Sequence, residues 1–161
     1  MMHISTRGEY GVRVMIDLAR HYGDGLRSLT EISQAEGLPV QYLEQLIKKL
    51  RDADLVQSVR GARGGYVLSR APENIRMSEV LRTLEGSLGP FSCLNDDISN
   101  VVCDWDRMDN CSTRVLWSRL RDAIVQTLES ITLAELSVGN APTQAVVSTA
   151  LGSSFASPIL P

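Results

Sequence analysis

Apolar residues return every three or four positions over much of the chain, which is the period of an amphipathic helix. The first such stretch follows an extended start at residues 2–5 and ends at the glycine-containing turn of residues 23–25. The pattern predicts one long helix before that turn. Its expected apolar face consists of Tyr10, Val14, Met15, Leu18, Ala19 and Tyr22.

Two further helices follow closely. Ser28 and Glu31 have the spacing of a capping box, and Gly37 is a typical stop after Glu36. Pro39 suits the first turn of the next helix, where its missing N–H is no loss. The apolar face of that third helix consists of Leu43, Leu46, Ile47 and Leu50. Two short helices joined by a glycine-containing turn predict a helix-turn-helix.

After Leu55 the pattern changes to short β stretches at residues 55–59 and 65–68, on either side of Arg60-Gly61-Ala62-Arg63-Gly64. This predicts a β-hairpin with a basic, glycine-rich tip. Such a tip can place Arg60 or Arg63 in a narrow minor groove, where the negative potential is strongest. A flexible hairpin with solvated arginines is the alternative, and the preceding helix-turn-helix favours the DNA contact.

A helical pattern at residues 78–84 leads to Gly86, and helical order returns near Ser112. The second helix has a long apolar stripe, made of Val115, Leu116, Leu120, Ile124, Leu128 and Ile131. Such a stripe must be buried, and a second copy of the chain together with the chain's own head would cover it. We therefore expect a homodimer, whose two-fold symmetry suits paired DNA half-sites.

These elements predict a mainly α fold, a winged helix-turn-helix with a small β-hairpin wing and a long C-terminal dimerisation helix. We assign residues 1–70 to the DNA-binding head and 71–111 to a linker helix and a cysteine loop. Residues 112–137 form the dimerisation helix. Residues 138–161 are rich in Ala, Ser, Thr, Gly and Pro and are expected to be disordered unless a partner orders them.

Composition and charge narrow the classes of function. The 161 residues carry a net charge of −3, but residues 1–70 hold ten Lys and Arg against eight Asp and Glu, so the head is mildly basic. With no apolar run of membrane-spanning length and no secretory pattern at the start, we expect a cytoplasmic protein without membrane contact. No nucleophile–base pair, catalytic carboxylate pair or phosphate-binding glycine loop is evident, which argues against an enzyme and a small-molecule substrate.

The third helix carries the candidate base contacts, because a recognition helix meets base edges through its N-terminal turns. Glu44 can accept from cytosine and Gln45 can pair with adenine, while Lys48 can reach phosphate, as can Lys49 and Arg51. Taken singly, each is more typical of a solvated helix face, and the fold context favours DNA. The predicted DNA-binding set is Ser28, Gln41, Tyr42, Glu44, Gln45, Lys48, Arg60, Gly61 and Arg63.

The three cysteines of the chain, Cys93, Cys103 and Cys111, fall in one loop rich in Gly, Pro and Asp. An odd number of cysteines in a reducing compartment argues against a disulfide framework and favours metal or redox chemistry over coincidence. Their spacing is wider than that of paired zinc ligands, although zinc stays open. The loop also holds the oxygen donors Asp104, Asp106 and Asp109. These aspartates could compete as metal ligands, but the simpler interpretation is that they keep the loop solvated.

Together, several segments resemble the Rrf-type bacterial winged-helix regulators, which include the IscR, NsrR and RirA regulators. They are the opening residues 4–10, the helix segment 42–46 with Leu50-Arg51, the wing from Val59 to Tyr66, the three cysteines, and Leu116-Trp117. The resemblance covers about residues 2–136. It implies a homodimer that binds operator DNA through the third helix and the wing, with an iron-sulfur cluster held by the three cysteines.

The fourth cluster ligand departs from the pattern of the cluster-assembly regulators. Where those carry a histidine ligand this chain has Arg114, and neither His3 nor His21 matches a ligand position. Glu9 matches the position at which related sensors present a carboxylate from the partner subunit; the plainer reading is a solvated glutamate near the start of a helix. Three cysteines and a carboxylate suit either 4Fe-4S or 2Fe-2S, and we favour 4Fe-4S.

The sensed signal stays open among redox state, nitric oxide and iron supply. The alternative function is a cluster-free regulator of the same fold, controlled by cysteine oxidation or by a protein partner.

Overall fold

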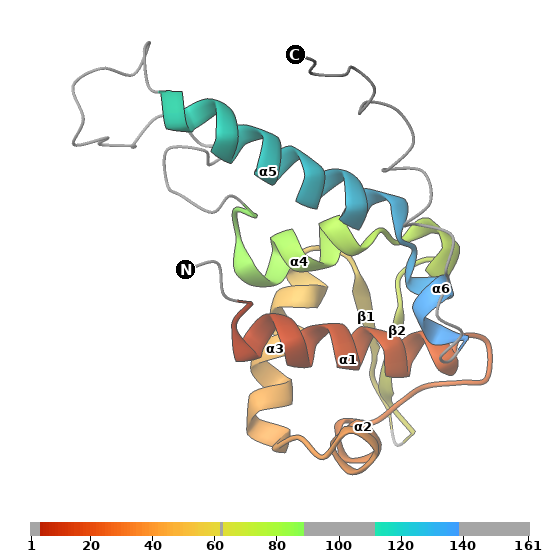
Figure 1. Cartoon of the computed structure of the whole chain (residues 1–161). Helices are drawn as coiled ribbons and strands as arrows, with labels where there is room; N and C mark the ends of the chain where they lie inside the picture. The colour runs from red at the N-terminus through yellow and green to blue at the C-terminus, as the bar shows by residue number, and fades with distance from the viewer. Residues whose placement is uncertain (1–3, 62, 89–111, 139–161) are drawn as a thin grey trace, which may run out of the picture.

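The computed structural model describes residues 4–61, 63–88 and 112–138. The chain forms, in order, helices α1 (Thr6–Arg20), α2 (Leu29–Glu36) and α3 (Val40–Asp52), strands β1 (Val56–Val59) and β2 (Gly65–Leu68), a short 3-10 helix (Pro72–Asn74), and helices α4 (Met77–Glu85), α5 (Ser112–Ser130) and α6 (Leu133–Ser137) (Figure 1). This mainly helical architecture with one antiparallel hairpin confirms the predicted fold class.

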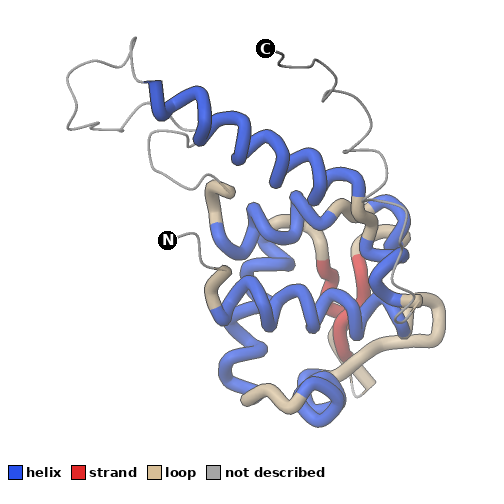
Figure 2. The backbone as a smooth tube through the Cα atoms, viewed as in Figure 1, coloured by secondary structure: helices blue, strands red, loops and turns tan. Residues whose placement is uncertain are grey.

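The core is formed chiefly by α1, α3, α4 and the base of the hairpin. Helix α4 lies between α1 and α5 (Figure 2). α1 and α4 approach closely at two glycines, because a Cβ at Gly8 would collide with the Glu85 carboxylate and one at Gly11 with Leu84. The side chains that are most completely buried are Val14, Met15, Ile32, Leu43, Leu46, Leu50, Leu55, Val56, Ile75, Val80, Leu84 and Leu133.

The hairpin has the predicted strands and turn. Val56 pairs with Leu68 at its base and Val59 with Gly65 near its tip. At the tip the Gly64 N–H donates to the Gly61 carbonyl at 3.0 Å, and Gly61 has a φ of 139°, which favours glycine. Only Val56 of β1 is buried, so the outer part of the hairpin projects from the core.

Two sequence-based helix boundaries were wrong by a few residues. Helix α1 ends at Arg20 instead of continuing to the glycine turn, because the Tyr22 N–H bonds back to the Ala19 carbonyl and closes the last turn tightly. Tyr22, which is 47% exposed, therefore does not join the buried face. The second boundary is that of α3: the sequence placed Pro39 in its first turn, whereas Pro39 is the N-cap and lies just before that turn.

Residues 112–137 form two helices where the sequence suggested one. Helix α5 ends at Ser130, and Thr132 starts α6 through a capping box with Glu135. The junction is fixed to the start of α4, since the Met77 N–H donates to the Ile131 carbonyl at 3.1 Å and the Leu133 N–H to the Ile75 carbonyl at 2.9 Å. No helix in the described ranges is both long and apolar enough to cross a membrane. The predicted disordered tail lies almost wholly outside these ranges.

Candidate DNA-binding and sensor sites

Helix α3 has one buried face and one polar exposed face. Its apolar positions are buried as the sequence predicts: Leu43, Leu46, Ile47 and Leu50. The opposite face exposes Gln41, Glu44, Gln45 and Lys48. Because exposed and buried residues alternate with the helical period, these four polar side chains share one surface that is free to meet another molecule.

Two other members of the predicted DNA-binding set have structural contacts. The Tyr42 ring is half-buried and stands perpendicular to the Tyr10 ring of α1, with 5.7 Å between their centroids. The Ser28 hydroxyl accepts from the Glu31 N–H at 3.3 Å and donates to the Glu31 carboxylate at 2.8 Å. Both residues therefore fix helices of the head, α3 against α1 and the start of α2.

The capping box also lowers the pKa of its own carboxylate, Glu31. The backbone N–H of Ser28 donates to Glu31 at 2.7 Å. These hydrogen bonds, first from the Ser28 backbone and then from its hydroxyl, hold the pKa of Glu31 below its ordinary value. An ionised carboxylate thus lies in the first turn of α2, where the helix dipole favours it.

The basic tip of the wing is exposed. Arg60, Gly61 and Arg63 all face solvent, at the end of the molecule where α2 and the beginning of α3 also lie (Figure 1). Gly64 supports the turn, since a Cβ there would lie 3.0 Å from the Gly61 carbonyl oxygen. The structure therefore brings the predicted wing residues and the polar face of α3 toward one end of the head.

The wing is also joined to the segment before α2, which the sequence analysis did not foresee. Arg27 and Tyr66 exchange two backbone hydrogen bonds, of 3.0 and 2.8 Å, and the Arg27 guanidinium binds Asp17 of α1. Arg27 and Asp17 lie ten positions apart on different elements. No local sequence signal marks such a pair.

The predicted cluster site is only partly within the described residues. Cys93, Cys103 and Cys111 lie outside them, as do the three aspartates of that loop, and among the described residues no group of His, Cys, Asp or Glu can hold a metal. Glu9 is described and lies exposed on α1.

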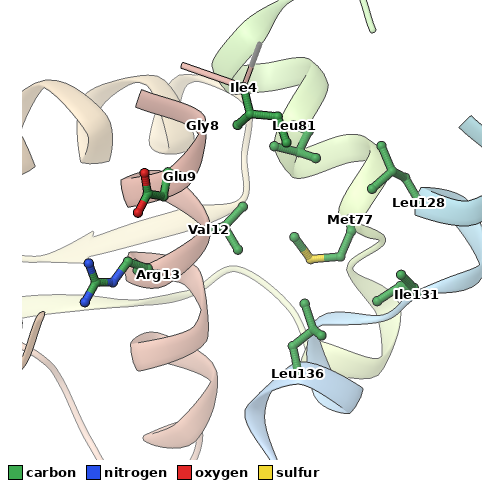
Figure 3. Close-up of a pocket in the computed structure, with 10 residues that line it drawn as sticks. All are labelled: Ile4, Gly8, Glu9, Val12, Arg13, Met77, Leu81, Leu128, Ile131 and Leu136. Carbon is green, nitrogen blue, oxygen red and sulfur yellow. The ribbon is translucent and has the colours of Figure 1, made fainter. Parts of the chain in front are cut away.

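Glu9 lies on the rim of an apolar groove of about 530 Å³ between α1, α4 and the α5–α6 junction. Figure 3 shows Val12, Met77, Leu128 and Leu136 turned toward the middle of this groove, whereas the Glu9 carboxylate points away from it. The carboxylate is thus presented outward and is accessible to a second molecule.

The N-terminal half of α5 exposes large apolar side chains. Val115 is 56% exposed, Leu116 58% and Leu120 39%, whereas Leu128 and Ile131 at the other end pack against the core. Among the residues that the structure describes, the core therefore covers this apolar stripe at its Leu128–Ile131 end only.

A family model described as Rrf2, iron-dependent transcriptional regulator, matches residues 4–138. The chain belongs to the Rrf2 family. The resemblance inferred from the sequence is thereby confirmed, and so is the prediction that this Rrf2 protein is a DNA-binding transcription regulator and not an enzyme.

Individual Rrf2 proteins are similar over most of their length. The chain is 43% identical over 135 residues to the HTH-type transcriptional regulator CymR of Bacillus subtilis (strain 168), covering 84% of this chain and 89% of that protein. The solved structure of CymR, the global cysteine regulator of B. subtilis, superposes with a TM-score of 0.70 at 42% identity, over 86% of this chain and 98% of that one. T. potens IscR gives a TM-score of 0.67 at 42% identity, over 83% and 85%.

Proposed function

We propose that this Rrf2 protein is a homodimer whose operator affinity depends on an iron-sulfur cluster, held by Cys93, Cys103, Cys111 and Glu9 of the partner subunit. The observation that carries the proposal is the exposed Glu9 carboxylate on α1, a helix whose opposite face is buried in the core of the DNA-binding head. The donor set fits the group, because three thiolates are typical iron-sulfur ligands and a carboxylate is a weaker, more labile fourth donor. We favour 4Fe-4S over 2Fe-2S.

The position of Glu9 supports a ligand that comes from the other subunit. Glu9 shares its groove with Leu128, near the C-terminal end of α5, whereas Cys111 immediately precedes Ser112, the first residue of α5. About 24 Å of helix separate Ser112 from Leu128. The beginning of α5 also projects beyond the rest of the head (Figure 1). A second subunit packed along α5 can bring its own α1 to that end.

The dimer is proposed to form through the exposed apolar residues of α5. Val115, Leu116 and Leu120 occupy successive turns, and exposed apolar surface of this kind marks interaction sites. A two-fold interface there would present two heads, each with α3 and a wing, to two half-sites.

Operator recognition is proposed to use the polar face of α3 and the wing tip. Glu44 and Gln45 are placed to read base edges and Lys48 to bind phosphate, while Arg60 and Arg63 enter the minor groove. Tyr42 and Ser28 act chiefly by fixing the helices that present these side chains. The coupling to the sensor runs through α1, because its buried face packs against α3 and α4.

When bound, the cluster supplies a redox-sensitive link between the cysteine loop of one subunit and α1 of the other. Glu9 would act through its own helix, because its bond to the cluster would restrain α1. The head would thus have two states, one with α1 restrained by the ligand bond and one with α1 released. A ligand shifts such an equilibrium only by its differential affinity for the two states. Holo and apo proteins must therefore differ in operator affinity.

The test is purification without oxygen, followed by the visible absorption spectrum and iron and sulfide analysis. We expect a chromophore that each Cys→Ala variant abolishes, and that Glu9→Ala alters or makes less stable in air. Glu73→Ala, an exposed glutamate on the 3-10 helix, is the matched control and should behave as wild type. If Glu9→Ala matches wild type in spectrum and air stability, the fourth ligand lies elsewhere, with the loop aspartates next.

A cluster-free regulator is the second candidate, and the similarity to CymR favours it, since that relative is named a global cysteine regulator. In this case the three cysteines act through oxidation, or the protein responds to a protein partner. Protein purified without oxygen would then be colourless and free of iron. Its operator affinity would change on thiol oxidation or on addition of the partner.

A further inference from the structure

Asp17 is a buried carboxylate near the C-terminal end of α1, only 3% exposed. The guanidinium of Arg27 pairs with it through two parallel hydrogen bonds, Nε to Oδ2 and Nη2 to Oδ1, each 3.0 Å long. This bidentate geometry is the strongest that arginine offers a carboxylate. The hydrogen bonds to Asp17 raise the pKa of Arg27, which keeps the guanidinium charged.

Other charged groups surround the pair without replacing it. The His21 ring nitrogen Nδ1 lies 2.8 Å from the Asp17 backbone carbonyl and 3.8 Å from its carboxylate. A Glu31 carboxylate oxygen lies 3.9 Å from the Arg27 Nη1. A buried carboxylate without a partner destabilises the folded protein, so the ion pair with Asp17 strongly favours this one position of Arg27.

The backbone of Arg27 is hydrogen-bonded to the wing. Its N–H donates to the Tyr66 carbonyl at 3.0 Å, and the Tyr66 N–H donates to the Arg27 carbonyl at 2.8 Å. The contact is close, because a Cβ at Gly65 would lie 2.9 Å from the Arg27 carbonyl oxygen. Arg27 therefore forms an isolated antiparallel bridge to Tyr66 in the outer part of β2.

The outer part of the hairpin is held through β2, where Tyr66 packs against the core and bridges to Arg27, whereas the outer part of β1 is exposed. In β1 only Val56, at the base, is buried, and Tyr66 pairs across the hairpin with Ser58, two residues before Arg60. A two-stranded hairpin alone is marginally stable in water. The bridge to Arg27 thus lies where it can fix the direction in which the wing projects.

We propose that the Asp17–Arg27 pair positions the wing, by fixing the Arg27 backbone to which the outer part of β2 is hydrogen-bonded. The proposal rests on the proposed DNA contact of Arg60 and adds the residues that direct it. Asp17 and Arg27 are positioning residues: they act on DNA binding through the wing and leave the α3 contacts unchanged.

A double-mutant cycle on the full-length protein tests this, with a duplex selected by the wild-type protein from a random-sequence library. Arg60→Ala should weaken binding by about tenfold in wild type and by less than about twofold in Asp17→Asn, because a misdirected wing no longer makes the contact. Gln45→Ala, on α3, should have the same effect in both backgrounds. A merely structural role of Asp17 would not produce this selective coupling.

The matched control is Glu36→Gln, which removes a carboxylate from another ion pair of α1, Arg13–Glu36 at 3.0 Å, without touching the wing. Arg60→Ala should retain its full effect in that background. Arg27→Lys, which keeps the charge but not the two parallel hydrogen bonds, should reduce the Arg60→Ala effect as Asp17→Asn does, and it serves if Asp17→Asn does not fold. An unchanged Arg60→Ala effect in these variants overturns the proposal.

Failure of the wing contact itself would be recognised separately. If Arg60→Ala has no effect even in wild type, the proposed DNA contact of Arg60 is wrong. Amide hydrogen exchange at Tyr66 then tests whether the Asp17–Arg27 pair positions the wing. Exchange at least tenfold faster in Asp17→Asn than in Glu36→Gln supports positioning of the wing by the pair. Equal exchange in the two variants overturns it.

Discussion

Gly11 of α1 packs directly against the Leu84 side chain of α4, with no room for even one methyl group between them. The contact lies within the core, where Leu84 is almost fully buried, and Gly8 makes a similar approach one turn earlier. Glycine in a helix interior is intrinsically unfavourable, so its presence here reflects the close approach of the two helices.

Substitution of Gly11 by alanine tests that contact, because the sign of the change in the free energy of unfolding depends on it. Helix propensity alone would stabilise the protein by about 1 kcal/mol. Overpacking against Leu84 opposes this, and we expect Gly11→Ala to lower the free energy of unfolding by about 1–3 kcal/mol. Urea unfolding measures the change, with exposed Arg20→Ala on the same helix as the control. A stabilised Gly11→Ala protein would show that α1 and α4 are not this close.

The two kinds of residue on the exposed face of α3 should be separable by DNA binding. Glu44→Ala should relax base preference at one operator position by about 1–3 kcal/mol, because it removes one base contact. Lys48→Ala should weaken all sequences alike and reduce the salt slope by about 1. Titrations against operator variants at several salt concentrations measure both effects. Unchanged affinity and base preference in both variants would remove this face from the interface.

Dimerisation through α5 should be sensitive to charge in its exposed apolar stripe. Leu116→Glu would bury an uncompensated carboxylate in the interface, and we expect the dimer dissociation constant to rise about a hundredfold or more. Sedimentation analysis gives this constant directly. Gln126→Glu, an exposed polar position on the same helix, adds the same charge and should leave the dimer intact. A wild-type monomer at micromolar concentration that still binds operator would contradict the interface.

The capping box predicts a pH dependence of stability. Because the pKa of Glu31 lies below its unfolded value of 4.5, its contribution is complete above pH 4.5 and is lost as pH falls through the lowered pKa. Glu31→Gln keeps a capping side chain but cannot titrate, so its stability should fall less steeply below pH 4.5. Urea unfolding over a pH series measures the slopes, with Glu73→Gln as the control. Identical slopes in wild type and Glu31→Gln would contradict this.

Much of the head could be predicted from the sequence because its signals are local. The apolar spacing from Leu43 to Leu50 identified the buried face of α3, and Ser28 with Glu31 identified the start of α2. The glycines around Arg60 identified the wing turn. Each of these signals depends on residues a few positions apart, where helix period and turn geometry decide the outcome.

Contacts between elements could not be predicted in this way. The pairing of Asp17 with Arg27 and the packing of Tyr42 on Tyr10 join separate helices and loops, and they have no periodic signature. Helix α6 is different, because Thr132 and Glu135 have capping-box spacing that could have located it. For the sensor, residue chemistry suggested the cysteine ligands, which lie outside the described residues.

If operator affinity depends on cluster state, as proposed, the holo and apo proteins must bind the same operator DNA with different affinities. Holo protein prepared without oxygen and apo protein made from it by anaerobic chelation are titrated against the same selected duplex at one salt concentration. We expect the two affinities to differ by about 5- to 150-fold, the usual range of coupling between two sites. The variant lacking all three thiols, through Ala at Cys93, Cys103 and Cys111, should bind like the apo protein. Equal affinity of the holo and apo forms, or protein that carries no iron when prepared without oxygen, would contradict the claim.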